Sequence, residues 1–155
     1  MTDYVHVVIP RGGRSLVEFI SSEAKVPVFA HLEGIVHIYV HDQADFDLTK
    51  AVVLNSKSRR PGICGAVETL LIDKGFHEKH GENLINFLIS QGIEIRANKK
   101  LFNNKFIVDI VESDYGFEFL DNILAVKVVE GIDSAISHIR NFGSNHTDCI
   151  LTEDK

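Results

Sequence analysis

A basic segment precedes Cys64 in the middle of the chain. Lys57, Arg59 and Arg60 lie within seven residues of the cysteine, and a Pro-Gly pair at 61–62 predicts a sharp turn between them. Nearby cations favour the thiolate, the nucleophilic form of cysteine, and turn N–H groups can stabilise a developing oxyanion. Cys64 is therefore a candidate nucleophile. The alternative is a small core side chain, because free cysteines are often buried.

The second cysteine, Cys149, lies in the apolar segment "DCILT" with no cation beside it, so we expect it in the core. Two cysteines make no disulfide framework, which favours a reducing cytoplasm. The sequence contains no apolar run of membrane length and no signal-peptide pattern at its start. We expect no membrane partner.

Two pairs of histidines are candidates for a metal site. His37 and His41, and His77 and His80, have spacings that could suit a metal. Zinc sites need three or four converging ligands, and no further ligand stands at convincing spacing, so we expect no metal. The net charge of -6 argues against nucleic acid as a partner, since phosphate binding needs a concentrated positive face.

These residues must be positioned by a fold that alternates strands with helices of about ten residues. A chain of 155 residues with 45% hydrophobic residues can bury one sizeable core. The pattern predicts an α/β fold with a largely parallel sheet. We predict strands at 4–9, 26–30, 35–40, 68–72, 93–97, 123–129 and 149–153, and helices at 14–24, 48–58, 82–92 and 133–143.

Several residues predict where these helices begin and end. Asp45 or Asp47 suits the N-cap of the helix near 48–58, and Asp133 that of the helix at 133–143. Gly92 and Gly143 suit helix ends. A strand already at residue 4 has little to pair with, so the sequence reads as if it begins within a larger domain.

Five segments carry a family resemblance, in this order: "VVIPRGGRSLVEFI", "VPVFAHLEGIVHIYV", "AVVLNSKSRRPGICGAVETLLI", "EFLDNILAVKVVEGIDSAISHI" and "NFGSNHTDCILTED". Together they resemble the middle and catalytic part of gamma-glutamyl phosphate reductase (glutamate-5-semialdehyde dehydrogenase), in the aldehyde dehydrogenase superfamily. The resemblance covers essentially the whole chain but well under half of the family's length. It implies an aldehyde dehydrogenase-type catalytic domain at 43–155, truncated at its C-terminus. It also implies a strand–helix–strand remnant of the NADP-binding domain at 1–42.

The resemblance also implies a reaction, in proline biosynthesis. Cys64 matches the family's nucleophile, which attacks L-glutamyl 5-phosphate, expels phosphate and leaves a thioester that NADPH reduces to the semialdehyde. Glu118 matches the glutamate that holds the nicotinamide ribose, and Gly12 and Gly13 match a loop near the cofactor. His31 stands where hydrolytic aldehyde dehydrogenases carry a glutamate base.

Two further residues are candidates for binding the substrate. A guanidinium suits a leaving phosphate, which makes Arg60 a candidate; the alternative is a surface charge. His146 in "SNHTD" matches a loop near the family's active site, or is an ordinary turn residue. One departure from the family pattern is Gly65, where an asparagine is typical.

Two functional hypotheses follow. The chain is an enzyme module whose cofactor domain lies on a separately encoded partner, or it is a non-catalytic remnant or interaction module that keeps the fold. In either case we expect weak NADPH binding and incomplete activity from the chain alone. Uncovered strand edges pair readily, so we also expect a homo-oligomer.

Overall fold

The computed structural model describes residues 4–30 and 33–154. The chain divides into two compact units between Glu33 and Gly34. From the sequence we placed a boundary near residue 42, with the strand at 35–40 in the first part. In the structure that strand is β1 (Val36–Val40), which pairs on both sides within the sheet of the second unit.

The first unit contains one helix, α1 (Arg14–Glu23), where the sequence predicts it. The strands predicted at 4–9 and 26–30 are reduced to a single parallel bridge between Val8 and Val28. Val8 donates to the carbonyl of Pro27 and accepts from the N–H of Phe29. Pro27 has no N–H of its own, so it cannot donate to a longer ladder.

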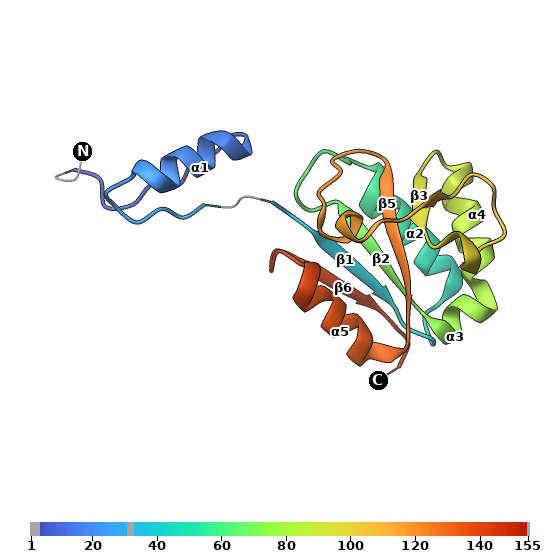
Figure 1. Cartoon of the computed structure of the whole chain (residues 1–155). Coiled ribbons are helices and arrows are strands. Elements are labelled where there is room, and N and C mark those ends of the chain that lie inside the picture. Colours follow the sequence, from blue (N-terminus) through green and yellow to red (C-terminus); the bar gives the residue numbers. More distant parts are fainter. Residues whose placement is uncertain (1–3, 31–32, 155) are drawn as a thin grey trace. The chain divides into compact units, whose positions relative to one another are not determined.

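The second unit is built on a six-stranded sheet in the order β4-β3-β5-β2-β1-β6 (Figure 1). All of its strand pairs are parallel, which confirms the α/β fold predicted from the sequence. Besides β1, the strands are β2 (Val67–Asp73), β3 (Glu94–Ala97), β4 (Val108–Asp109), β5 (Ile123–Val129) and β6 (Asp148–Leu151).

Helices cover both faces of this sheet. Figure 1 shows α2 and α4 on one face and α5 on the other. The helical segments are α2 (Phe46–Ser58), α3 (Lys74–Phe76), the π-helix η1 (His77–Gly81), α4 (Glu82–Ser90), α5 (Gly131–Phe142) and the 3-10 turns η2 (Lys99–Leu101) and η3 (Glu112–Gly116).

The predicted helix ends are mostly correct. Asp45 caps α2 by accepting from the N–H of Leu48 at 2.7 Å, and Gly92 after α4 has a φ of +82°, the left-handed conformation that favours glycine. The prediction for Asp133 is wrong. Gly131, with a φ of +74°, turns the chain earlier, so α5 begins there and Asp133 lies in its first turn.

The face under α2 and α4 holds the main hydrophobic core. Aliphatic and aromatic side chains from the strands and both helices are fully buried there, among them Val53, Leu70, Ile72, Phe76 and Leu84. Along β2, Leu70 and Ile72 point to this core because every second residue of a strand faces the same side of the sheet. A shift of one residue would turn them to the other face, so their burial fixes the register of the strand.

The opposite face, under α5, is more polar. His37 and His138 are buried there with their rings 5.5 Å apart, and Lys127 Nζ lies 3.1 Å from Nδ1 of His138. Burial, with smaller contributions from Lys127 and His37, lowers the pKa of His138 to about 3. Burial also lowers the pKa of His37, although the carboxylate of Asp148 partly opposes the shift.

Candidate active site

Cys64 lies on an exposed loop between α2 and β2. Two consecutive turns form this loop: the N–H of Ile63 donates to the carbonyl of Arg60, and the N–H of Ala66 donates to that of Ile63. Pro61 takes the second position of the first turn, where its fixed φ is suitable. Cys64 follows as the second residue of the next turn, at the surface.

A cleft of about 390 Å³ adjoins this loop. Ile63 and Gly65, the neighbours of Cys64 on either side, form part of its wall, and the exposed Arg59 and Arg60 form another part. Asn55, Ser56 and Ala66 complete the lining. The two guanidinium groups in its wall make the cleft suitable for a small anion, although Cys64 itself is not part of the lining.

The third predicted cation, Lys57, does not face this cleft. It is fully buried on the inner side of α2, with Nζ 2.7 Å from Oε2 of the equally buried Glu68 on β2. Burial is the main effect on both groups: it lowers the pKa of Lys57 and raises that of Glu68, while each charge opposes the shift of the other. Lys57 is therefore part of the structure around the site.

Glu118 is brought to the nucleophile loop through Gly34. The N–H of Gly34 donates to Oε1 of the half-buried Glu118 at 2.9 Å. A Cβ atom on Gly34 would overlap the carbonyl oxygen of Cys64, so the two backbones are in close contact. Glycine is required at this position because only its backbone can approach so closely. From the sequence we named Cys64 and Glu118 as candidates and did not include Gly34.

His146 lies in the exposed loop before β6. Its Nδ1 is 2.9 Å from the hydroxyl of Thr147. Ser144 in the same loop accepts a hydrogen bond at 2.9 Å from the N–H of Ile35, next to Gly34. The loop that carries His146 is thereby anchored beside the start of β1.

Gly34, Cys64, Glu118 and His146 each precede a strand of the parallel sheet: β1, β2, β5 and β6. Because the amino ends of parallel strands meet at one edge, the topology places all four segments at the same end of the sheet. The candidate active site is therefore assembled from the loops that enter the strands.

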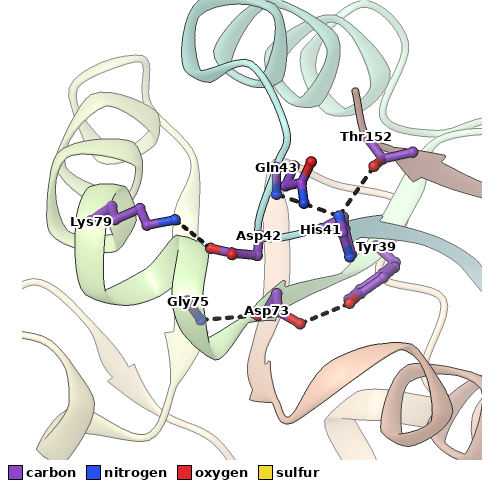
Figure 2. A network of polar contacts seen from close by, with 8 residues as sticks. All are labelled: Tyr39, His41, Asp42, Gln43, Asp73, Gly75, Lys79 and Thr152. Carbon is purple, nitrogen blue, oxygen red and sulfur yellow. Dashed lines mark hydrogen bonds and ion pairs between the residues drawn. The ribbon is translucent and has the colours of Figure 1, made fainter. Parts of the chain in front are cut away.

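The carboxyl end of the sheet holds a different polar network, shown in Figure 2. Tyr39 donates to Asp73 at 2.8 Å, and Asp73 also accepts from the N–H of Gly75 at the start of α3. Lys79 pairs with Asp42 at 2.7 Å. These side chains pair with one another, so the network joins β1 and β2 to the helical segment that follows β2.

The histidine pairs have structural partners. His41 Nδ1 lies 3.1 Å from the hydroxyl of Thr152 (Figure 2), and His37 Nδ1 lies 3.1 Å from the carboxylate of Asp148. His80 stacks on Phe46, and the ring of His77 contacts Phe102 edge-on. Within residues 4–30 and 33–154, no three histidine, cysteine or acidic side chains come together in a way that could hold a metal.

Two glycines of the first unit, Gly12 and Gly13, precede α1. Gly13 is the N-cap, and a Cβ atom there would meet no atom within 4 Å, so a ligand could approach its backbone. His31 lies outside the residues that the structure describes. Across the described residues, no helix is long and apolar enough to cross a membrane.

The expectation that Cys149 lies in the core is wrong. Cys149 is exposed on β6, which forms the edge of the sheet beside β1. The apolar run around it indicated a strand correctly but gave no information on its position in the sheet.

Comparison with known proteins finds relatives that match almost the whole of this chain. No profile of a known protein family matches the sequence. Gamma-glutamyl phosphate reductases from Rhodopseudomonas palustris (strain TIE-1) and Bradyrhizobium sp. (strain ORS 278) are each 48% identical over 151 residues, 97% of this chain and 35% of the relative. The chain is a relative of gamma-glutamyl phosphate reductase. It spans about a third of the length of these curated relatives.

Solved structures agree with this relationship. Gamma-glutamyl phosphate reductase from Thermotoga maritima is 36% identical and superposes with a TM-score of 0.91 over 98% of this chain and 37% of its own. The same enzyme from Saccharomyces cerevisiae is 31% identical, with a TM-score of 0.60 over 99% of this chain and 39% of its own. An acetylating aldehyde dehydrogenase from Geobacillus thermoglucosidasius, 20% identical with a TM-score of 0.69 over 97% of this chain and 42% of its own, shares the fold. The family resemblance and the aldehyde dehydrogenase-type fold predicted from the sequence are confirmed.

Proposed function

We propose that this chain carries the acyl-transfer part of the reduction of L-glutamyl 5-phosphate to L-glutamate 5-semialdehyde. The Cys64 thiolate attacks the acyl carbon, the bond from that carbon to the phosphate oxygen breaks, and phosphate leaves with the electron pair. The product is a thioester on Cys64. NADPH, when bound, supplies the hydride that reduces this thioester, after which the thiolate is released from the aldehyde.

One observation carries this proposal. Cys64 is exposed, and its two neighbours in the chain line a cleft together with Arg59 and Arg60. Glu118 accepts from Gly34, which lies against the backbone of the same loop. A nucleophile, an anion-binding wall and a carboxylate that can hold a ligand hydroxyl thus converge at one end of the sheet.

Three groups of residues in this chain would bind the substrate and stabilise the oxyanion. Arg60 binds the phosphate that leaves, through charge-assisted hydrogen bonds. Cys64 and Gly65 are exposed residues whose N–H groups form no backbone hydrogen bond within the described chain, so these groups can donate to the oxyanion that forms on the acyl carbon. His146 binds the substrate from the loop before β6.

The residues proposed for the cofactor fit that role. Glu118 uses Oε1 to accept from Gly34, which leaves Oε2 for a ribose hydroxyl of NADPH. Gly12 and Gly13 would let backbone approach the cofactor. We propose that the second unit, from Gly34 on, is the nucleophile-bearing domain, and that the first unit belongs to the NADP-binding domain.

This proposal also includes a cellular compartment and a partner that completes the cofactor site. A reducing cytoplasm keeps the exposed thiol of Cys64 free. Complete reduction would involve a partner that supplies the remaining cofactor contacts, either a further copy of the chain or a separately encoded domain.

Acyl transfer can be tested without any cofactor. Incubation with acetyl phosphate, followed by mass spectrometry of the cysteine peptides, should give a hydroxylamine-sensitive thioester on Cys64 and none on Cys149, which is also exposed. Arg60→Gln should slow acylation at least severalfold, while the matched Arg140→Gln on α5 should not. Absence of a Cys64 adduct, or equal labelling of the two cysteines, would favour the non-catalytic alternative.

A further inference from the structure

The buried ion pair between Lys57 and Glu68 touches the loop that carries Glu118. Its two side chains are completely buried and make contact at 2.7 Å across α2 and β2. The second carboxylate oxygen of Glu68, Oε1, accepts from the N–H of Leu120 at 3.3 Å. The backbone of Phe119 also donates to this carboxylate, and this hydrogen bond opposes the rise in the pKa of Glu68.

The backbone at this point is in an uncommon conformation. Leu120 has a φ of +55°, in the left-handed region that a residue with a Cβ atom rarely adopts. Such a conformation persists where the surrounding structure holds it, and it is frequent near active sites. The buried carboxylate of Glu68 contacts this residue from the core side. On the other side, the Leu120 carbonyl faces the space beside Gly62, in the turn before Cys64.

The restrained segment leads directly to the candidate site. Glu118, two residues before Leu120, accepts from the N–H of Gly34, and Gly34 lies against the carbonyl of Cys64. The charges of Glu118 and Asp121 also oppose the lowering of the Lys57 pKa, so both carboxylates act electrostatically on the ammonium group.

We propose that Glu68, held in place by Lys57, is a positioning residue that fixes the 118–121 segment and thereby orients Glu118 toward Gly34 and the Cys64 loop. Neither Lys57 nor Glu68 lines the cleft, so their effect passes through the backbone of Leu120. The role of Glu68 in catalysis rests on the function proposed above. Its role in fixing the 118–121 segment does not depend on that function.

Hydrogen exchange of single amides, followed by NMR, tests this proposal directly. The decisive variant is Lys57→Met/Glu68→Leu, because replacing both partners of a buried pair by apolar side chains generally preserves the fold. We expect the amides of Leu120 and Gly34 to exchange at least tenfold faster, since each loses or loosens a hydrogen bond to a carboxylate. Core amides such as Leu70 and Ile72 should exchange at the wild-type rate.

The control is Lys79→Met, which breaks an ion pair of the same 2.7 Å length at the other end of the sheet and should leave both amides unchanged. An unchanged Gly34 amide in the double variant would overturn the proposal, and so would a rise shared equally by the core amides. If the double variant does not fold, Glu68→Gln serves in its place. Its neutral amide is a weaker acceptor for Leu120, so the same selective increase is expected, and its absence would overturn the proposal.

The hydrogen-exchange experiment and the acyl-transfer experiment test different proposals. Exchange can respond as expected in a chain whose Cys64 is never acylated, and Cys64 can be acylated in a chain whose Gly34 amide does not respond. Failure of one experiment therefore leaves the other to be judged by its own result.

Discussion

Mild acid should destabilise this protein through His138. The imidazole is 3% exposed on α5, its Nδ1 faces the ammonium group of Lys127, and its Nε2 is buried without a hydrogen-bond partner in the described structure. Because Nδ1 accepts from the ammonium group, the neutral ring carries its hydrogen on Nε2. A second proton would go to Nδ1, where it would break this hydrogen bond and place a second cation beside Lys127. The fold therefore holds the pKa of His138 at about 3, below its ordinary value of 6.5.

The size of the effect follows from proton linkage. Above pH 6.5 the ring is neutral in both the folded and the unfolded chain, and the full stability is present. Between pH 6.5 and about 3 the unfolded chain binds a proton that the folded chain does not, so stability falls as the pH falls. Each pH unit is worth at most about 1.4 kcal/mol, which gives a loss of roughly 2 kcal/mol between pH 6.5 and 4.5.

Urea unfolding measured every half pH unit from 7 to 4.5 provides the assay. With a slope of about 2 kcal/mol per molar urea, the midpoint should fall by about 1 M over this range. His138→Gln keeps an acceptor for Lys127 and should remove most of that fall, while the exposed His6→Gln should not. The ring of His37, whose pKa burial also lowers, and the ring of Tyr115 both contact His138, and the contribution of His37 remains in both variants.

An equal pH dependence in His138→Gln and the wild-type chain would refute this reasoning. It would mean that the folded chain accepts the proton by moving α5, or that other groups dominate acid unfolding.

Four other outcomes are expected. Cys64 should react with iodoacetamide faster than Cys149 at neutral pH, because arginines line the cleft beside it; mass-spectrometric mapping that finds Cys149 labelled first would contradict this. Gly34→Ala should lower the melting temperature and slow Cys64 acylation more than tenfold, because its Cβ would overlap the Cys64 carbonyl, whereas Gly65→Ala meets open space and should leave the melting temperature unchanged. NADPH should bind the chain with a Kd in the millimolar range by calorimetry, and micromolar binding would make the chain self-sufficient. Light scattering should show self-association, because β6 leaves an exposed edge with Ile150 46% exposed, and a monomer at high concentration would count against it.

The sequence predicted where strands and helices lie along the chain better than it predicted their positions in the sheet and their burial. The segment 123–129 was expected as a strand and forms β5 with those bounds, because its apolar run is long and bordered by turn residues. β4 has only two residues, too few to produce a pattern. Cys149 was placed in the core because composition does not distinguish an edge strand from a central one.

The candidate site shows the same limit. Cys64 was found from its own neighbours, but Gly34 is required by a contact with a residue far away in the sequence. Lys57 was interpreted as a cation beside the nucleophile, although it follows Val53 by one helical turn on the buried face of α2. A glutamate inside the apolar strand at 68–72 was the available signal that this lysine had an internal partner.

The pairing of β6 with β1 has a consequence for how the protein forms. The contact between His37 and Asp148 joins positions 111 residues apart, and that between Ile35 and Ser144 joins positions 109 apart. Pairings of such separation require a large loop to close and form late in folding. Until β6 arrives, β1 is an open edge and His37 is exposed to water. During synthesis the loop that carries Cys64 therefore emerges well before the His146 loop, so the nascent chain exposes this thiol before β6 can complete the sheet.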